Sequence, residues 1–86
     1  MRSQLDFNAL TIFVAVAEKE SFVGAAKALE MPTSNVSRCI SQLEKKLNLQ
    51  LIERSTRRMK LTPSGHLLYL RAKPLLEALD QTEAEL

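Results

Sequence analysis

Two helices separated by a tight turn are predicted by residues 21–48, SFVGAAKALEMPTSNVSRCISQLEKKLN. Ser21 is a suitable N-cap for the first helix, about 22–29, in which apolar residues recur at helical spacing: Phe22, Ala25, Ala26 and Leu29. Pro32 ends this helix, because proline disfavours helical angles in the residue before it and itself suits the first turn of a new helix. The second helix is therefore predicted over about 32–47.

The helix predicted over 32–47 has two faces of different chemistry and ends at Asn48, which tolerates the left-handed conformation. One face is an apolar stripe of Val36, Cys39, Ile40, Leu43 and Leu47. The other face is polar, with no carboxylate before Glu44, and consists of Thr33, Ser34, Asn35, Ser37, Arg38 and Gln42. Asparagine and glutamine pair bidentately with adenine, and arginine with guanine or phosphate. With the small Ala25 and Ala26 at the expected crossing, the pattern predicts a helix-turn-helix whose second helix reads a DNA major groove.

The flanking segments predict a third core helix and a small wing. Apolar residues at helical spacing predict a helix over about 7–18, for which Asp6 is the N-cap. Two short strands are predicted at 51–54 and 59–62, on either side of a polar turn. An isolated two-stranded ribbon is marginal, so we expect three apolar residues to anchor it on the helices: Leu51, Ile52 and Leu61. The predicted fold is mainly α, a winged helix-turn-helix with a three-helix core and a two-stranded wing.

A long helix is predicted over 63–86, with Thr62 as N-cap and Pro63 in its first turn. Apolar residues at alternating spacings of four and three form a coiled-coil seam of Leu68, Ala72, Leu75 and Leu79. Such a seam needs a second helix, which we expect from another copy of the chain in a homodimer. The alternative is a wide face packed on the chain's own core by Leu67, Leu70 and Leu76. Pro74 removes one helical hydrogen bond, and we expect a bend one turn before it.

The charge of the chain is concentrated in its middle third. The 86 residues, 45% apolar and 26% charged, are typical of one compact domain with a net charge of only +2. Residues 38–60 nevertheless carry seven basic side chains against two acidic ones, and Arg57 and Arg58 among them fall at the tip of the predicted wing. Such a cationic stretch suits a polyanionic partner, although a solvated face would have the same composition.

The sequence contains no anchor, metal site or catalytic constellation that we can identify. Its apolar runs are shorter than a membrane span, and its N-terminus lacks the apolar region of a signal peptide, so we expect a cytoplasmic protein with no membrane partner. One cysteine, Cys39, and one histidine, His66, cannot supply an internal disulfide or a set of zinc ligands. The run Ser64-Gly65-His66 lacks the pattern of a nucleophile elbow. We therefore expect no metal, no cofactor and no enzymatic activity.

Four stretches of the chain resemble the N-terminal DNA-binding domain of LysR-type transcriptional regulators, a bacterial family. They are SFVGAAKAL (21–29), VSRCISQLE (36–44), LNLQLIER (47–54) and LTPSG (61–65). The resemblance implies a winged helix-turn-helix DNA-binding domain over 1–62 and a linker helix over 63–86 that pairs two subunits. It also implies a larger C-terminal domain, absent from this chain, that binds a small effector and drives tetramer assembly.

The resemblance assigns roles to individual residues of this sequence. It implies that Ser37 and Arg38 lie at the groove and that Ser21, at a helix start, meets a phosphate. It further implies that Arg54 and Arg57 belong to a wing that approaches the DNA backbone or minor groove, where the charge pattern also places Arg58. Together with the polar face of the helix over 32–47, these residues form the predicted DNA-binding set.

Two functions are compatible with the sequence. The first is sequence-specific binding of double-stranded DNA, at an imperfect palindrome, by a homodimer in the cytoplasm that associates with the nucleoid. The alternative is a helical protein-interaction adaptor whose basic wing docks on an acidic partner. Only the first requires the steep salt dependence that accompanies phosphate neutralisation.

Overall fold

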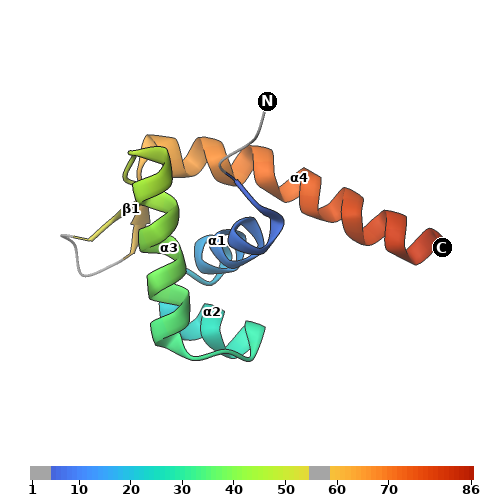
Figure 1. Cartoon of the computed structure of the whole chain (residues 1–86), viewed down its shortest axis with the longest axis horizontal. Helices are drawn as coiled ribbons and strands as arrows, with labels where there is room; N and C mark the ends of the chain where they lie inside the picture. Colours follow the sequence, from blue (N-terminus) through green and yellow to red (C-terminus); the bar gives the residue numbers. More distant parts are fainter. Residues whose placement is uncertain (1–4, 55–58) are drawn as a thin grey trace.

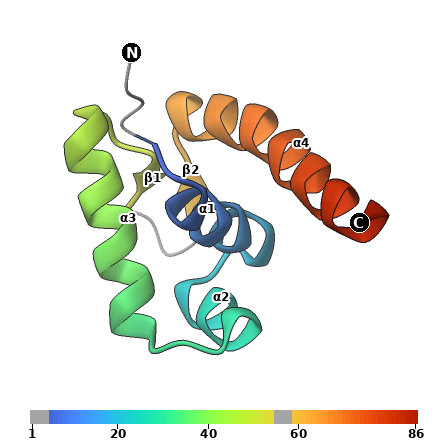
Figure 2. The ribbon, with the colours of Figure 1, turned by 45° about the vertical axis from the view of Figure 1, so that its right-hand side comes forward.

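The computed structural model describes residues 5–54 and 59–86 and contains four helices and a two-stranded antiparallel sheet in this part of the chain. In chain order the elements are α1 (Phe7–Lys19), α2 (Phe22–Leu29), α3 (Thr33–Leu47), β1 (Ile52–Glu53), β2 (Lys60–Leu61) and α4 (Pro63–Glu85). Helix α1 lies between α3 and α4 and contacts both, while α2 closes one end of the core (Figures 1 and 2). The predicted winged helix-turn-helix is confirmed.

The starts of α1, α2 and α4 are fixed by side-chain caps that the sequence predicted. Asp6, Ser21 and Thr62 each accept a hydrogen bond from the amide three residues later, at 2.7, 2.9 and 3.0 Å respectively. Asn48 ends α3 in the left-handed conformation, with a φ of 54°. The prediction for the start of α3 was one residue early, because Pro32 has extended backbone angles and occupies the N-cap position.

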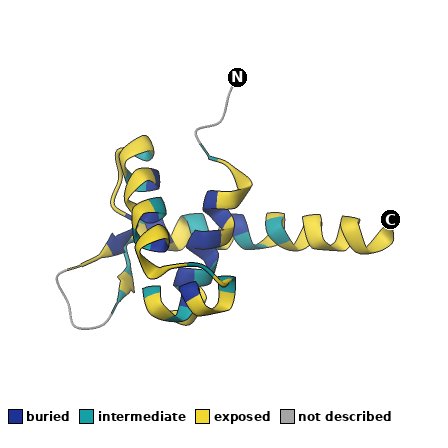
Figure 3. Ribbon diagram, turned by 60° about the horizontal axis from the view of Figure 1, so that its bottom comes forward, coloured by how far each residue is buried: buried dark blue, intermediate teal, exposed yellow. Residues whose placement is uncertain are grey.

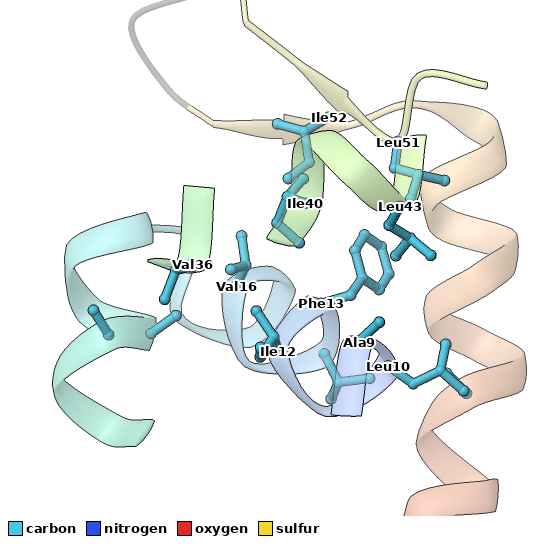
Figure 4. Close-up of a cluster of buried hydrophobic side chains, with 14 residues drawn as sticks. Ala9, Leu10, Ile12, Phe13, Val16, Val36, Ile40, Leu43, Leu51 and Ile52 are labelled. Atoms are coloured by element: carbon cyan, nitrogen blue, oxygen red, sulfur yellow. The ribbon is translucent and has the colours of Figure 1, made fainter. Parts of the chain in front are cut away.

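The core is formed by α1 packed against the apolar stripe of α3. Phe13 and Val16 of α1 are completely buried, and Figure 4 shows them pointing toward Ile40 and Val36 of α3 and the neighbouring Leu43. Ala25 and Ala26 of α2 are also buried, which allows α2 to approach its neighbours closely. The predicted stripe is confirmed for Val36, Ile40 and Leu43, which are buried. Its remaining members, Cys39 and Leu47, are only half-buried at the edge of the core.

The wing is shorter than predicted and is attached through its first strand. Only two residues of each strand pair, Ile52 opposite Leu61 and Glu53 opposite Lys60. Leu51 and Ile52 are buried in the core, which confirms them as anchors, and Leu61 is half-buried. The predicted tip residues, Arg57 and Arg58, lie outside the described residues.

Helix α4 is divided into a docked N-terminal half and an exposed C-terminal half. Ala72 is buried and Leu68 is half-buried against the chain's own core, so these two residues of the predicted seam pack within the chain, and their contact with a second subunit stays a prediction. Helix α1 packs along this half of α4, where the hydroxyl of Tyr69 donates to Glu18 at 3.0 Å and Lys73 forms an ion pair with the same carboxylate. From residue 77 to residue 86 every side chain is exposed (Figure 3).

The two remaining seam residues stay available to a partner. Leu75 and Leu79 are 53% and 45% exposed. Leu67 and Leu70 are exposed as well, so the alternative of a wide face packed on the chain's own core holds only for the half-buried Leu76. The ribbon of α4 continues through Pro74 and curves along its length (Figures 1 and 2).

A close approach between α4 and the wing makes Gly65 the least replaceable glycine. A Cβ atom at Gly65 would lie 2.1 Å from the carbonyl oxygen of Leu51, which is itself held by a hydrogen bond from the amide of Thr62 at 3.0 Å. We predict that Gly65→Ala lowers the free energy of unfolding by ~1–3 kcal/mol, because backbone must move to relieve the clash. Denaturant unfolding followed by circular dichroism measures this loss.

The matched control for this substitution is Gly24→Ala in α2. The nearest atom to a Cβ at Gly24 is a side-chain carbon of Lys19 at 3.2 Å, a mild contact that alanine's better helix propensity partly offsets. We expect this variant to change the unfolding free energy by less than ~1 kcal/mol. Equal losses in the two variants would contradict the close approach at Gly65.

Candidate nucleic-acid interface

The outward side of α3 presents the polar residues that the sequence predicted for DNA contact. Ser37 is half-buried, and the other five are exposed. The exposed residues are Thr33, Ser34, Asn35, Arg38 and Gln42. Within the described ranges, their side chains take part in no hydrogen bond or ion pair, so their donors and acceptors are available to a ligand. The burial pattern in Figure 3, with buried residues gathered where the helices meet, leaves this side of α3 on the surface.

The N-terminal ends of α2 and α3 provide positive electrostatic potential beside this face. Neither helix has an acidic residue in its first turn, and Pro32 supplies no side-chain hydrogen bond to the first amides of α3. Unpaired amides and the helix dipole make such an end favourable for an anion. Ser21 caps α2 by accepting from the amide of Gly24, which leaves its hydroxyl proton free to be donated. Both helix ends can therefore receive phosphate groups.

A cleft of about 290 Å³ runs between the start of α1 and the exposed side of α3. It brings Asn35, Arg38 and Gln42 together with two polar residues that the sequence analysis missed, Asn8 and Lys46. Lys46 lies four residues after Gln42, so continuing the helical period of the polar face would have found it. Asn8 belongs to another helix, and no spacing in the sequence links it to α3.

The predicted residues outside α3 do not line this cleft. Ser21 lies at the start of α2, and Arg54 follows β1. Arg57 and Arg58 fall outside the described residues. The structure therefore brings together only part of the predicted DNA-binding set. The residues of α3 share one face, whereas Ser21 and Arg54 lie next to α2 and β1.

Arg54 is engaged within the chain by a residue that the sequence analysis did not select. Its Nη2 atom donates to Oε1 of Glu44 at 3.0 Å, and its guanidinium carbon lies 5.6 Å from the centre of the Phe22 ring. The second oxygen of Glu44, Oε2, accepts from the amides of Leu51 and Ile52 at 2.8 and 3.2 Å. The sequence offered one signal for the role of Glu44: it places a carboxylate in the last turn of α3, where the helix dipole disfavours negative charge.

Cys39 borders the same cleft and is half-buried. Burial, and secondarily the negative charge of Asp6, raise the pKa of its thiol. A raised pKa keeps the thiol protonated at neutral pH, and a protonated thiol is a poor nucleophile.

The described residues contain neither a metal cluster nor a membrane-spanning helix. Residues 5–54 and 59–86 contain no group of three or more histidine, cysteine, aspartate or glutamate side chains that could hold a metal ion. In the same ranges, no helix has both the length and the apolar character needed to span a bilayer. The chemistry that this part of the surface offers is hydrogen bonding and positive potential along α3.

Comparison with known families gives one match that covers most of the chain. The sequence model described as "Bacterial regulatory helix-turn-helix protein, lysR family" matches residues 7–66. The chain is 46% identical over 76 residues to the uncharacterized HTH-type transcriptional regulator YhjC of Escherichia coli, covering 88% of the chain and 25% of that protein. It is 51% identical over 71 residues to a probable hydrogen peroxide-inducible genes activator of Mycobacterium avium, covering 83% of the chain and 23% of that protein.

A solved structure with the same fold contains DNA. The crystal structure of the BenM DNA-binding domain in complex with catB site 1 DNA superposes with a TM-score of 0.89 and 41% sequence identity, covering 94% of this chain and 90% of that one. The chain spans about a quarter of the length of the curated relatives it matches. The similarity therefore concerns the DNA-binding part of such regulators.

The reactivity of Cys39 tests the electrostatics of the cleft. We predict that alkylation by iodoacetamide reaches half its maximal rate at a higher pH than for a free cysteine, because burial raises the pKa of the thiol. Asp6→Asn, which keeps a good N-cap but removes the negative charge, lowers this midpoint. The measurement is the pH profile of labelling rate by mass spectrometry, and a midpoint at or below that of free cysteine contradicts the burial.

Proposed function

The chain belongs to the lysR family of bacterial regulatory helix-turn-helix proteins, and on this premise we propose that it binds a specific double-stranded DNA site as a homodimer. The observation that carries the proposal is the exposed polar face of α3, whose opposite side is fixed in the core. An α-helix fits the major groove of B-DNA, where each base pair offers a distinct pattern of donors and acceptors. The structure of the BenM domain with DNA supports the same use of this fold.

Within this proposal the residues have three kinds of role. Asn35, Arg38 and Gln42 contact base edges, where one bidentate pair contributes about 1–3 kcal/mol of discrimination. Ser37 lies at the groove beside Arg38, and Thr33, Ser34 and Ser21 contact phosphates or fix the register of α3 near the helix N-termini. Arg57 and Arg58 neutralise backbone phosphates from the wing. Arg54 stands apart because Glu44 and Phe22 already engage its guanidinium.

Dimerisation through α4 is part of the proposal. Leu75 and Leu79 lie one turn apart in the C-terminal half of α4, and each is about half exposed. An exposed apolar pair in this half of the helix suits pairing with the same helix of a second copy. Two copies would present two α3 helices to the half-sites of an imperfect palindrome.

The role of the whole protein is proposed from its relatives, which are transcriptional regulators about four times as long as the matched segment. We propose that residues 1–62 form the DNA-binding unit and 63–86 the linker helix of a bacterial transcription factor that acts in the cytoplasm at the nucleoid. The small-molecule effector would bind a C-terminal domain outside this chain. The proposed activity is binding and regulation, without catalysis or cofactor.

Salt titration of duplex binding tests the proposal against an adaptor that docks on an acidic protein. We predict that the logarithm of the binding constant falls steeply with the logarithm of salt concentration, as expected for about four to eight phosphate contacts. Fluorescence anisotropy with a duplex selected from a random pool measures the slope. A flat slope, or equal affinity for selected and random duplexes, would favour the adaptor.

Two arginine variants separate base reading from phosphate contact. Arg38→Ala is expected to reduce the preference for the selected duplex by about 1–3 kcal/mol with little effect on nonspecific binding. Arg57→Ala is expected to weaken all duplexes similarly and to reduce the salt slope by about one unit. Identical behaviour of the two variants would show that this division of roles is wrong.

The seam is tested by Leu75→Asp. This substitution places an unpaired carboxylate in the proposed interface, so we expect monomers in analytical ultracentrifugation and much weaker binding to a palindrome than to a single half-site. Leu70→Asp is the matched control, because Leu70 is an exposed leucine of α4 that lies on the side of the helix away from Leu79. Dimers that persist in Leu75→Asp, or are lost equally in both variants, contradict the seam.

A further inference from the structure

Glu44 organises the connection between α3 and the wing. Its carbonyl oxygen accepts from the amides of Asn48 and Leu49, which close the end of α3. Its carboxylate then reaches forward to the amides of Leu51 and Ile52, at 2.8 and 3.2 Å. The side chain of Glu44 is only 13% exposed, so it exchanges water for these fixed donors. One residue of α3 therefore determines where β1 begins.

Arg54 completes the same arrangement from the far end of β1. Its guanidinium bonds the free oxygen of Glu44 at 3.0 Å and lies over the ring of Phe22 at 5.6 Å. Phe22 is the first residue of α2 and packs against the core. Arg54 thus connects the wing to α2 and α3 at once, through a planar group suited to both contacts.

A direct phosphate contact fits this geometry less well. The carboxylate of Glu44 lies within hydrogen-bonding distance of the guanidinium, and the opposite charges of the pair largely cancel toward a polyanion. A phosphate would also have to compete with that carboxylate for the same arginine. The Arg54 side chain is 39% exposed, so part of it faces solvent, but its geometry is set from within the chain.

We propose that Glu44 and Arg54 are positioning residues for DNA recognition: together with Phe22 they hold the wing at a fixed angle to the reading face of α3. This inference rests on the proposed function, because it assigns to the Glu44–Arg54 ion pair and Phe22, which we call the brace, a role in a complex with duplex DNA. Specific binding requires the base-reading helix and the wing to meet the duplex in one register. Nonspecific binding needs phosphate contacts but no fixed register, so a wing held at another angle can still neutralise phosphates.

The decisive comparison is between two glutamate variants of equal charge. Glu44→Gln breaks the ion pair, whereas Glu53→Gln removes one negative charge from the exposed strand residue next to Arg54 and leaves the brace intact. We expect Glu44→Gln to reduce the affinity ratio of selected to random duplex roughly tenfold, the loss of one charge-assisted contact. Glu53→Gln leaves this ratio unchanged. The ratio is insensitive to a partly unfolded sample, which lowers both affinities equally.

Arg54→Met and the double variant supply the second readout. We expect Arg54→Met to reduce the same affinity ratio while its salt slope stays at the wild-type value, because no phosphate contact is lost. The Glu44→Gln, Arg54→Met double variant should be no worse than Arg54→Met alone, since both changes remove one shared interaction. A phosphate-binding Arg54 would instead lower the slope by about one unit on replacement.

Opposite results overturn the inference without touching the proposed function. If Glu44→Gln binds duplex more tightly than Glu53→Gln, the carboxylate had been restraining an arginine that contacts phosphate, and the positioning role is wrong. A salt slope reduced in Arg54→Met leads to the same conclusion. A wild-type chain whose duplex binding does not depend on salt would instead contradict the proposed function and the inference together.

Discussion

The packing of Phe13 and Val16 of α1 against the apolar stripe of α3 is the constraint on which the rest of the structure depends. A helix with one buried stripe cannot rotate about its axis without exposing that stripe to water, at about 25 cal/mol for each Å². Burying Val36 and Ile40 therefore turns Arg38 and Gln42 outward. The proposed reading face is a consequence of core packing, and the free side chains on it are available because the core needs none of them.

The connection after α3 transfers this fixed orientation to the wing and to α4. Glu44 binds the amides at the start of β1, and the carbonyl of Leu51 lies so close to Gly65 that only a glycine fits there. The amide of Thr62 donates to the same carbonyl, and the hydroxyl of Thr62 caps α4 by accepting from the amide of Gly65. Helices α3 and α4 and the wing thus meet around the backbone amide and carbonyl of the buried Leu51. A regulator that must present a helix and a wing together gains from such a junction, because errors in one angle would displace both contacts.

Sequence reasoning predicted what depends on neighbours along the chain and missed what depends on contacts across it. The caps at Asp6, Ser21 and Thr62, the left-handed Asn48 and the apolar stripe of α3 follow from local spacing, and the structure has them. Leu68 and Ala72 of the predicted seam pack on the chain's own core, which the sequence did not indicate, because a heptad pattern does not reveal whether its partner is α1 or another subunit. The role of Glu44 was missed for the same reason, because its donors lie seven and eight residues away, at the start of β1.

The central claim is that the outward face of α3 is the surface that meets duplex DNA. The most direct measurement is a titration of the ¹⁵N-labelled chain with a selected duplex, with backbone amide shifts followed residue by residue. The predicted result is that the largest changes fall on residues 33–42 and at the start of α2, next to Ser21. Changes confined to α4, with residues 33–42 unaffected at saturation, would contradict the claim.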